Sequence, residues 1–122
     1  MHNLVKIAAM GLLLSATGAT ASDCTAPDVP TMPSGSTASM EEMLSGQQAV
    51  KAFQAANLEY MGCLDPMIAA AKAKADSEDA TKDDLKTLKS LEEQYNAAVS
   101  EEEDLAGKFN AQIRAYKEAN PG

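Results

Sequence analysis

Few side chains in this sequence belong to types that carry out chemistry, and the clearest candidates are its two cysteines, Cys24 and Cys63. An even number of cysteines in a short chain is typical of a disulfide formed in an oxidising compartment. A bridge between them would close a loop of about 38 residues and contribute roughly 4 kcal/mol to stability by the loop-entropy model. The sequence therefore predicts one structural disulfide, Cys24–Cys63.

The residues that could act as catalysts lack the partners that catalysis needs. His2 is the only histidine, and it lies in a segment that we expect to be removed, so no imidazole base remains. The serines and threonines have no adjacent base to activate a hydroxyl nucleophile, and there is no glycine-rich phosphate loop. We predict that the chain is not an enzyme and has no catalytic residues, no cofactor-binding residues and no cofactor.

Acidic and methionine side chains are the remaining candidates for binding an ion. The acidic residues between Asp76 and Asp84 resemble a calcium loop in charge alone, because the mid-loop glycine and the spaced bidentate glutamate are missing. The residues 101–104 are all acidic, but they point around a helix and cannot converge on one ion. Met40 and Met43 share a helix face, which could suit monovalent copper, although methionines on a helix are more often core residues. We assign no metal ligand.

The first 21 residues have the features of a signal peptide. Lys6 supplies the positive charge, and residues 7–14 form an apolar segment that is too short to span a bilayer. Residues 19–21 read Ala-Thr-Ala, which matches the small-residue motif for cleavage. We expect the mature chain to begin at Ser22 and to be located in the periplasm or secreted.

The mature chain would be strongly acidic. The net charge of the full sequence is −8, and removal of Lys6 with the leader makes it −9. Nucleic acids and anionic membrane surfaces attract basic patches, so this charge argues against both as partners. We expect no nucleic acid and no membrane insertion after signal removal; a solvated acidic surface or a basic partner is compatible with the charge.

Residues 22–38 lack a helical period and are predicted to form an extended, proline-rich strap. Pro27, Pro30 and Pro33 recur every third residue, which places all three rings along one edge of a polyproline II segment. Residues 34–37 then read Ser-Gly-Ser-Thr, which favours a turn. If Cys24 is bonded to Cys63, this strap must double back along the following helix.

Residues 39–75 are predicted to form the first helix. Ser39 and Glu42 match a capping box at its start. Two apolar rows with heptad spacing follow: Met43, Val50, Asn57, Leu64 and Ala71 at position a, and Gly46, Phe53, Tyr60 and Met67 at position d. Pro66 interrupts this helix, so we expect a kink or a short break near residues 63–65.

Residues 81–119 are predicted to form a second, longer helix after a charged loop. Its heptad rows are Leu85, Glu92, Val99, Ala106 and Ile113 at position a, and Leu88, Tyr95, Glu102, Phe109 and Tyr116 at position d. Leu91, Ala98 and Leu105 lie at position g and widen the apolar stripe beyond a coiled-coil seam. Glu102 is an exception, because it is an acidic residue on the stripe.

Two helices of similar length joined by a short loop favour an antiparallel hairpin. The predicted fold is therefore all-α: residues 39–120 form a two-helix, coiled-coil-like hairpin, and one disulfide holds the strap to it. Counting outward from the loop places Tyr60 near Tyr95, Phe53 near Leu105, and Met43 near Ile113.

The motifs together resemble a group of small, uncharacterised exported proteins of Gram-negative bacteria. The resemblance is carried by Cys24 with its three spaced prolines, by Tyr60-x2-Cys63-Leu64, and by the pairs Tyr95-Asn96 and Phe109-Asn110. It implies a periplasmic location and a helical fold, and it implies no activity. Pro66 departs from the uninterrupted helix that the resemblance implies.

The sequence favours a non-catalytic interaction or structural component of the bacterial envelope that acts through a helix face. A two-helix layer cannot bury both stripes fully, so the strap, a second copy or a protein partner must cover the remainder. The expected helix-face contact residues are Phe53, Tyr60, Tyr95, Phe109, Ile113 and Tyr116. The alternatives are a small periplasmic chaperone-like binder of unfolded clients and a copper or calcium buffer.

Overall fold

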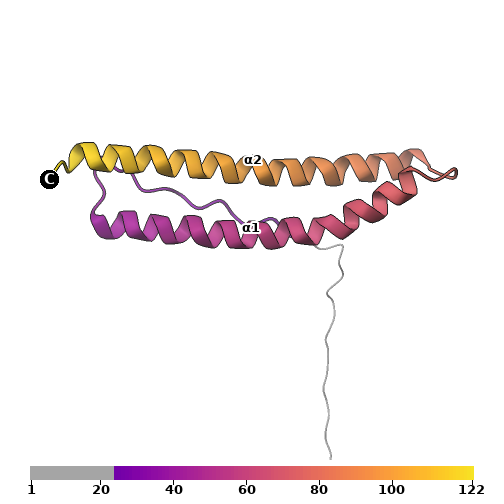
Figure 1. Ribbon diagram of the computed structural model, residues 1–122, viewed down its shortest axis with the longest axis horizontal. Coiled ribbons are helices and arrows are strands. Elements are labelled where there is room, and N and C mark those ends of the chain that lie inside the picture. Colours follow the sequence, from indigo (N-terminus) through magenta and orange to yellow (C-terminus); the bar gives the residue numbers. More distant parts are fainter. Residues whose placement is uncertain (1–23) are drawn as a thin grey trace, which may run out of the picture.

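A computed structural model describes residues 24–122 as an antiparallel pair of long helices with an extended segment lying between them (Figure 1). The helices are α1, Met40–Ala75, and α2, Lys82–Ala119. The predicted signal peptide, residues 1–21, lies outside the described residues. The all-α hairpin expected from the sequence is confirmed, since the described chain contains these two helices, packed on each other, and no strand.

Both helices begin at capping boxes. The Ser39 hydroxyl accepts a hydrogen bond from the Glu42 amide, and the Glu42 carboxylate accepts one from the Ser39 amide. Thr81 and Asp84 form the same reciprocal pair at the start of α2. Each box satisfies two amides that would otherwise have no helical partner.

The two heptad rows predicted for α1 face α2. Of the nine residues in those rows, eight are buried and Met67 is partly buried. Leu64 and Asn57 are each only 1% exposed, which places the centre of the interface at the middle of α1.

Pro66 does not break α1, because the helix is continuous from Met40 to Ala75. Of the two alternatives expected near residues 63–65, a kink or a short break, the break does not occur. Figure 1 shows that the last turns of α1 bend toward α2. A proline inside a helix removes one hydrogen bond and kinks the axis, so the bend and not a break is how this helix accommodates the ring.

The buried stripe of α2 is narrower than the predicted one, which combined positions a, d and g. Its buried residues are Leu91, Ala98 and Leu105 from position g and Phe109 from position d. In the predicted a row, Leu85 is 54% exposed and Val99 is 37% exposed. The strap packs on the g side of α2 beside Leu105, whereas Leu91 is buried nearer the loop, where it lies with Met67 and Ala71 of α1.

The strap runs from Cys24 to Ala38 in the groove between the helices (Figure 1). Its burial has a period of three: Cys24, Pro27, Pro30 and Pro33 are partly buried, and most residues between them are exposed. This is the one-sided arrangement of rings expected for a polyproline II segment. The strap then turns at residues 34–38, where the amides of Thr37 and Ala38 donate to the Ser34 carbonyl over 3.1 and 2.8 Å.

The core is divided into two clusters along the hairpin. One lies at the end near the chain termini, and the strap packs against it through Met32 and Ala38; its buried members are Met43, Val50, Phe53, Leu105 and Phe109. The other surrounds the disulfide and extends toward the loop; its buried members are Tyr60, Leu64, Ala71, Leu91 and Ala98. No helix among residues 24–122 is long and apolar enough to cross a membrane.

Candidate functional site

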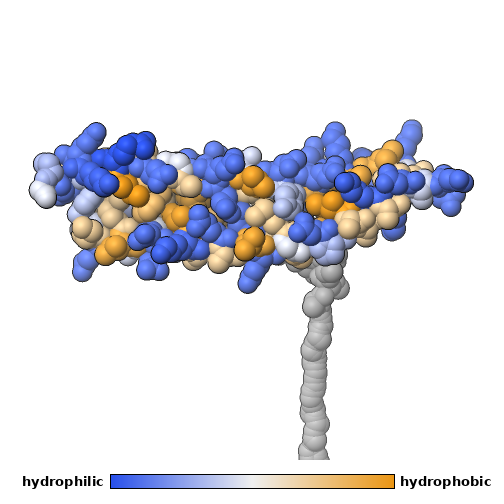
Figure 2. Space-filling view, viewed as in Figure 1, coloured by the Kyte–Doolittle hydropathy of each residue, from blue (hydrophilic) through white to orange (hydrophobic). Residues whose placement is uncertain are grey.

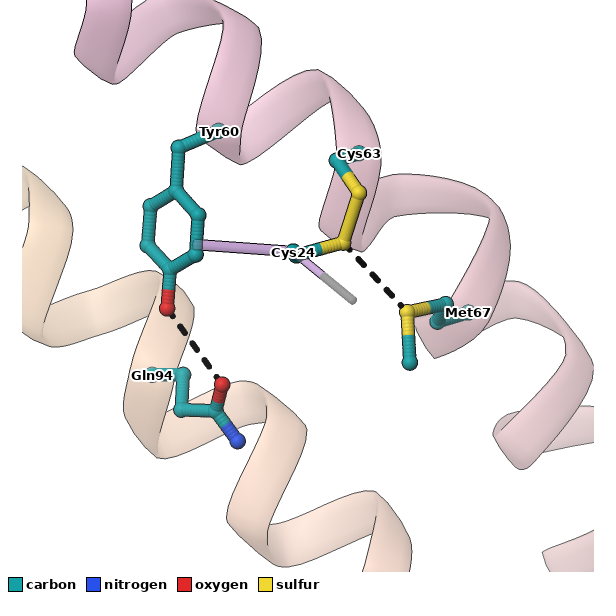
Figure 3. The surroundings of a disulfide bond; sticks show 5 residues. All are labelled: Cys24, Tyr60, Cys63, Met67 and Gln94. Atoms are coloured by element: carbon teal, nitrogen blue, oxygen red, sulfur yellow. Dashed lines mark hydrogen bonds between the residues drawn. A yellow bond between two sulfur atoms is a disulfide. The ribbon is translucent and has the colours of Figure 1, made fainter. Parts of the chain in front are cut away.

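The disulfide between Cys24 and Cys63 joins the start of the strap to α1, as the sequence predicted, with a Cα–Cα distance of 5.7 Å. Figure 3 shows Tyr60 and Met67, from α1, on either side of the bridge. The Met67 Sδ atom lies 3.5 Å from Cys24 Sγ, a sulfur–sulfur contact because an oxidised cysteine carries no proton. The Tyr60 hydroxyl crosses to α2 and donates to Gln94 Oε1 over 3.3 Å (Figure 3).

The groove that holds the strap, called here the strap groove, is formed by both helices. It is lined by Ser45, Gly46 and Ala49 from α1 and by Glu101, Leu105 and Lys108 from α2. Ala49, Ala56 and Cys63 follow one another at seven-residue intervals on α1, and all three are partly buried. A row of small side chains at this spacing lets an extended segment lie close to a helix.

Gly46 sets the depth of the strap groove. A methyl group placed on it would lie 2.9 Å from Pro33 Cδ and 3.0 Å from Phe109 Cε1, closer than carbon atoms normally approach. The Pro33 ring therefore occupies the volume that a side chain at this position would fill. The strap and the helix interface meet at this point.

Gly35 fixes the other end of the strap to α2. Its amide donates to Gln112 Oε1 over 2.8 Å, and its α-carbon is packed so closely on α2 that an added methyl would collide with the Gln112 carbonyl oxygen. Gly35 is buried although it lies in a turn. The turn is thus docked onto the last third of α2, and only a residue without a side chain fits there.

One polar pair lies at the centre of the hairpin. The Asn57 amide nitrogen donates to the Ala98 carbonyl over 3.0 Å and to the Glu102 carboxylate over 3.1 Å. This accounts for the acidic residue on the stripe of α2. A buried asparagine at a heptad a position is known to specify register, because a shifted pairing would leave its amide without partners.

The side of the hairpin opposite the strap has no covering element, and it is called here the uncovered face. At 100° per residue, Val99, Ala106 and Ile113 lie across α2 from the strap-lining residues Glu101 and Lys108. The apolar residues of the uncovered face are Leu58, Met61 and Ile68 from α1 and Leu85, Val99, Ala106 and Ile113 from α2. Leu58 is the most exposed of them, at 69%.

Polar groups interrupt the uncovered face. A shallow cavity of about 460 Å³ lies on it, lined by Asp65, Ile68, Glu92, Tyr95 and Asn96. Figure 2 shows the same alternation on one long side of the molecule, where apolar patches recur at intervals and are separated by hydrophilic side chains. The apolar surface is therefore a series of patches and not one continuous sheet.

The six predicted helix-face contact residues divide into two groups. Phe53, Tyr60 and Phe109 are buried between the helices, where they hold the hairpin together. Tyr95, Ile113 and Tyr116 are partly buried at its margins. Tyr95 and Ile113 therefore remain accessible in part from the uncovered face, whereas the first group is enclosed.

The candidate ion-binding groups do not converge. Within residues 24–122, no three histidine, cysteine or acidic side chains are placed to hold a metal ion. Of the two methionines on one helix face, Met43 is buried and Met40 is 57% exposed. In the loop region, the Thr81 amide bonds to the Asp84 carboxylate and lowers the pKa of Asp84 below its ordinary value. The negative charge of Asp84 therefore belongs to the capping box of α2.

The sequence analysis did not identify three of these contacts: Pro33 on Gly46, Gly35 with Gln112, and Asn57 with Glu102. The last could have been found, since both residues lie on their stripes and oppose each other when the hairpin register is counted from the loop. Comparison with protein families, curated proteins and solved structures finds no match to this chain.

Proposed function

We propose that this chain is a non-catalytic exported protein, an interaction or structural component of the bacterial envelope, that acts through the uncovered face. The disulfide is compatible with an oxidising compartment, which agrees with the signal peptide expected from the sequence. Among the described residues the geometry offers long helix surfaces, and no three histidine, cysteine or acidic side chains are placed to hold a metal ion.

The observation that carries the proposal is the unequal covering of the two sides of the hairpin. The strap packs beside Leu105 on one side of α2, while Leu85 and Val99 on the other side remain 54% and 37% exposed. Exposed apolar residues are common singly, but a row that recurs along two adjacent helices and has polar margins is typical of an interaction site. A partner helix packed there would complete a three- or four-helix layer.

A photo-crosslinking residue placed at Val99 in the exported protein tests this proposal. Ser100 is its matched control, because it is the next residue, is exposed, and points 100° away from Val99. Crosslinking in intact cells should yield one discrete product from position 99 and little from position 100. Light scattering of the purified, oxidised protein then shows whether that product is a second copy.

The substitution Val99→Asp adds a required control, since it should remove the product by placing a charge among apolar contacts. Equal crosslinking from both positions, or a product unaffected by Val99→Asp, would contradict the proposal. A broad range of products that increases when cells accumulate unfolded proteins would instead favour the chaperone-like binder.

A further inference from the structure

The strap is held in its groove in the way that a bound peptide is held. Between residues 25 and 33, no hydrogen bond joins the strap to either helix within the described chain. Its attachment consists of partly buried rings at every third position, with Pro33 packed over Gly46 and beside Phe109. Grooves that receive proline rings at this spacing are a common way to bind polyproline II peptides, and here the aromatic side chain beside a ring is Phe109.

Nothing in these contacts requires that the strap and the groove belong to the same chain. The contacts join the strap to α1 and α2, and the covalent links between strap and helices are the turn at residues 34–38 and the Cys24–Cys63 disulfide. Ser34, Ser36 and Thr37 are exposed in that turn. The Thr37 and Ala38 amides, which bond to the Ser34 carbonyl, could bond to water if the turn opened.

The disulfide, like the strap contacts, does not require that its two cysteines belong to the same chain. Cys24 is the first residue of the strap in the described chain, and its bond to Cys63 of α1 holds that end of the strap on the hairpin. A bond between Cys24 of one chain and Cys63 of another would close on the same geometry. Oxidation would then lock whichever pairing is present until thiol exchange releases it.

We propose that the strap groove is also a binding site for the strap of a second copy of this chain. In this dimer each turn is open, the strap-entry ends of the two hairpins meet, and each groove holds the partner's strap. Two crossed Cys24–Cys63 bonds close the assembly with two-fold symmetry. Exchange of an identical segment re-forms every groove contact in the partner, which is why domain swapping is a low-cost route to dimers.

The choice of a second copy as the occupant follows from the fit. The strap is the one segment whose match to the groove is shown, from Cys24 through Pro33 to Gly35. The exchange uses the strap side of the hairpin and leaves the uncovered face as it is. Its success or failure is therefore independent of the function proposed above.

Reoxidation of mixed isotopes tests the proposal with the unmodified full chain. Equal amounts of ¹⁵N-labelled and unlabelled protein are reduced, mixed at high concentration and oxidised together. The disulfide-linked dimer is then isolated on a non-reducing gel, digested and analysed by mass spectrometry. Only peptides that join one labelled and one unlabelled chain are counted. We expect the Cys24–Cys63 peptides to exceed the Cys24–Cys24 peptide, and likewise the Cys63–Cys63 peptide, by about tenfold, where random pairing gives about twofold for each comparison.

Two strap variants make the test specific to the groove and leave both helices unchanged. Pro27→Asp places a charge at a partly buried position and should reduce the crossed bond to the random level. Ala26→Asp places the same charge at the adjacent exposed position and should leave the crossed bond in excess. Absence of a linked dimer, a random distribution of bonds, or equal effects of the two variants would overturn the proposal.

Discussion

At the scale of single residues, Asn57 is the polar side chain buried in the core of the described hairpin. It is 1% exposed and bonds to both Ala98 and Glu102 of α2. Burial of an amide is favourable only when its partners are in place, and the same requirement makes a wrong register costly. The pair therefore stabilises one alignment of the helices against others.

Asn57→Ala should destabilise the protein by about 2–3 kcal/mol, because it removes two buried hydrogen bonds and leaves a cavity. Urea unfolding followed by circular dichroism measures the change. Gln54→Ala, one turn away and exposed, is the control and should change stability by less than about 0.5 kcal/mol. Equal effects of the two substitutions would show that the polar pair contributes nothing.

Asp84 gives the stability of the hairpin a dependence on acid. Its pKa is lowered chiefly by the bond from the Thr81 amide, partly opposed by desolvation and assisted by the Thr81 hydroxyl and by Lys74. Because the pKa is lower in the folded state, the charged form contributes stability above the ordinary value of 3.8. That contribution is lost as the pH falls through the lower folded-state pKa.

Asp84→Asn should therefore lower the urea midpoint at neutral pH and change it little at pH values below the folded-state pKa of Asp84. Thermal or urea unfolding at a series of pH values measures this difference. Asp83→Asn makes the same charge change outside the capping box and is the control. A parallel pH dependence in the Asp84 variant and the wild type would refute the assignment.

At the scale of the elements, two glycines in α1 face different surroundings. Gly46 lies beneath Pro33 and Phe109, whereas nothing lies within 4 Å of a methyl group placed on Gly62. Glycine inside a helix costs roughly 0.5–1 kcal/mol relative to alanine, so its retention at position 46 reflects the fit of the strap.

Gly62→Ala should stabilise the protein by about 0.5–1 kcal/mol, and Gly46→Ala should destabilise it by about 1–3 kcal/mol through overpacking. Thermal unfolding of the oxidised protein gives both values. The opposite signs are the test, since both substitutions have the same effect on helix propensity. Stabilisation by both would mean that the strap does not rest on Gly46.

The helix stripes show which part of this structure could be predicted from sequence. The rows of α1 and the d row of α2 were correct, because a heptad repeat states which residues face a partner helix. The g residues Leu91, Ala98 and Leu105 were also placed on the stripe correctly, whereas the a row was only partly correct, since Ile113 packs against the core but Leu85 and Val99 are exposed. How far the buried stripe extends to each side depends on how the two helices and the strap pack, and periodicity within one helix has no access to that information.

At the scale of the whole molecule, the disulfide and the strap together hold the N-terminal segment on the hairpin. The path of the strap was predictable, because Cys24, the prolines and Cys63 set its ends and its length. Its anchors at Gly46 and Gln112 were not predictable, because they depend on where two helices and a turn meet. The sequence left open whether Pro66 would kink α1 or break it, because the outcome depends on tertiary packing that can compensate the local cost of proline.

Replacement of both cysteines, Cys24→Ser with Cys63→Ser, should reduce the free energy of unfolding by roughly 4 kcal/mol. A hairpin of two helices has little other core to offset that loss, so the oxidised wild type and the variant should differ strongly in urea midpoint. Reduced wild type should match the variant, and this is the internal control. A variant as stable as the oxidised protein would show that the strap is held by packing alone.

The position of the bridge also determines how the molecule would respond to mechanical force. A pull between the N-terminal side of Cys24 and Gly122 passes through the disulfide directly into α1 at Cys63. The strap and the first two-thirds of α1 lie inside the closed loop, so tension bypasses them and they cannot be extended. Only the chain after Cys63 can lengthen. Under load, residues 64–122 would extend, whereas the distance between Cys24 and Cys63 would stay fixed by the disulfide.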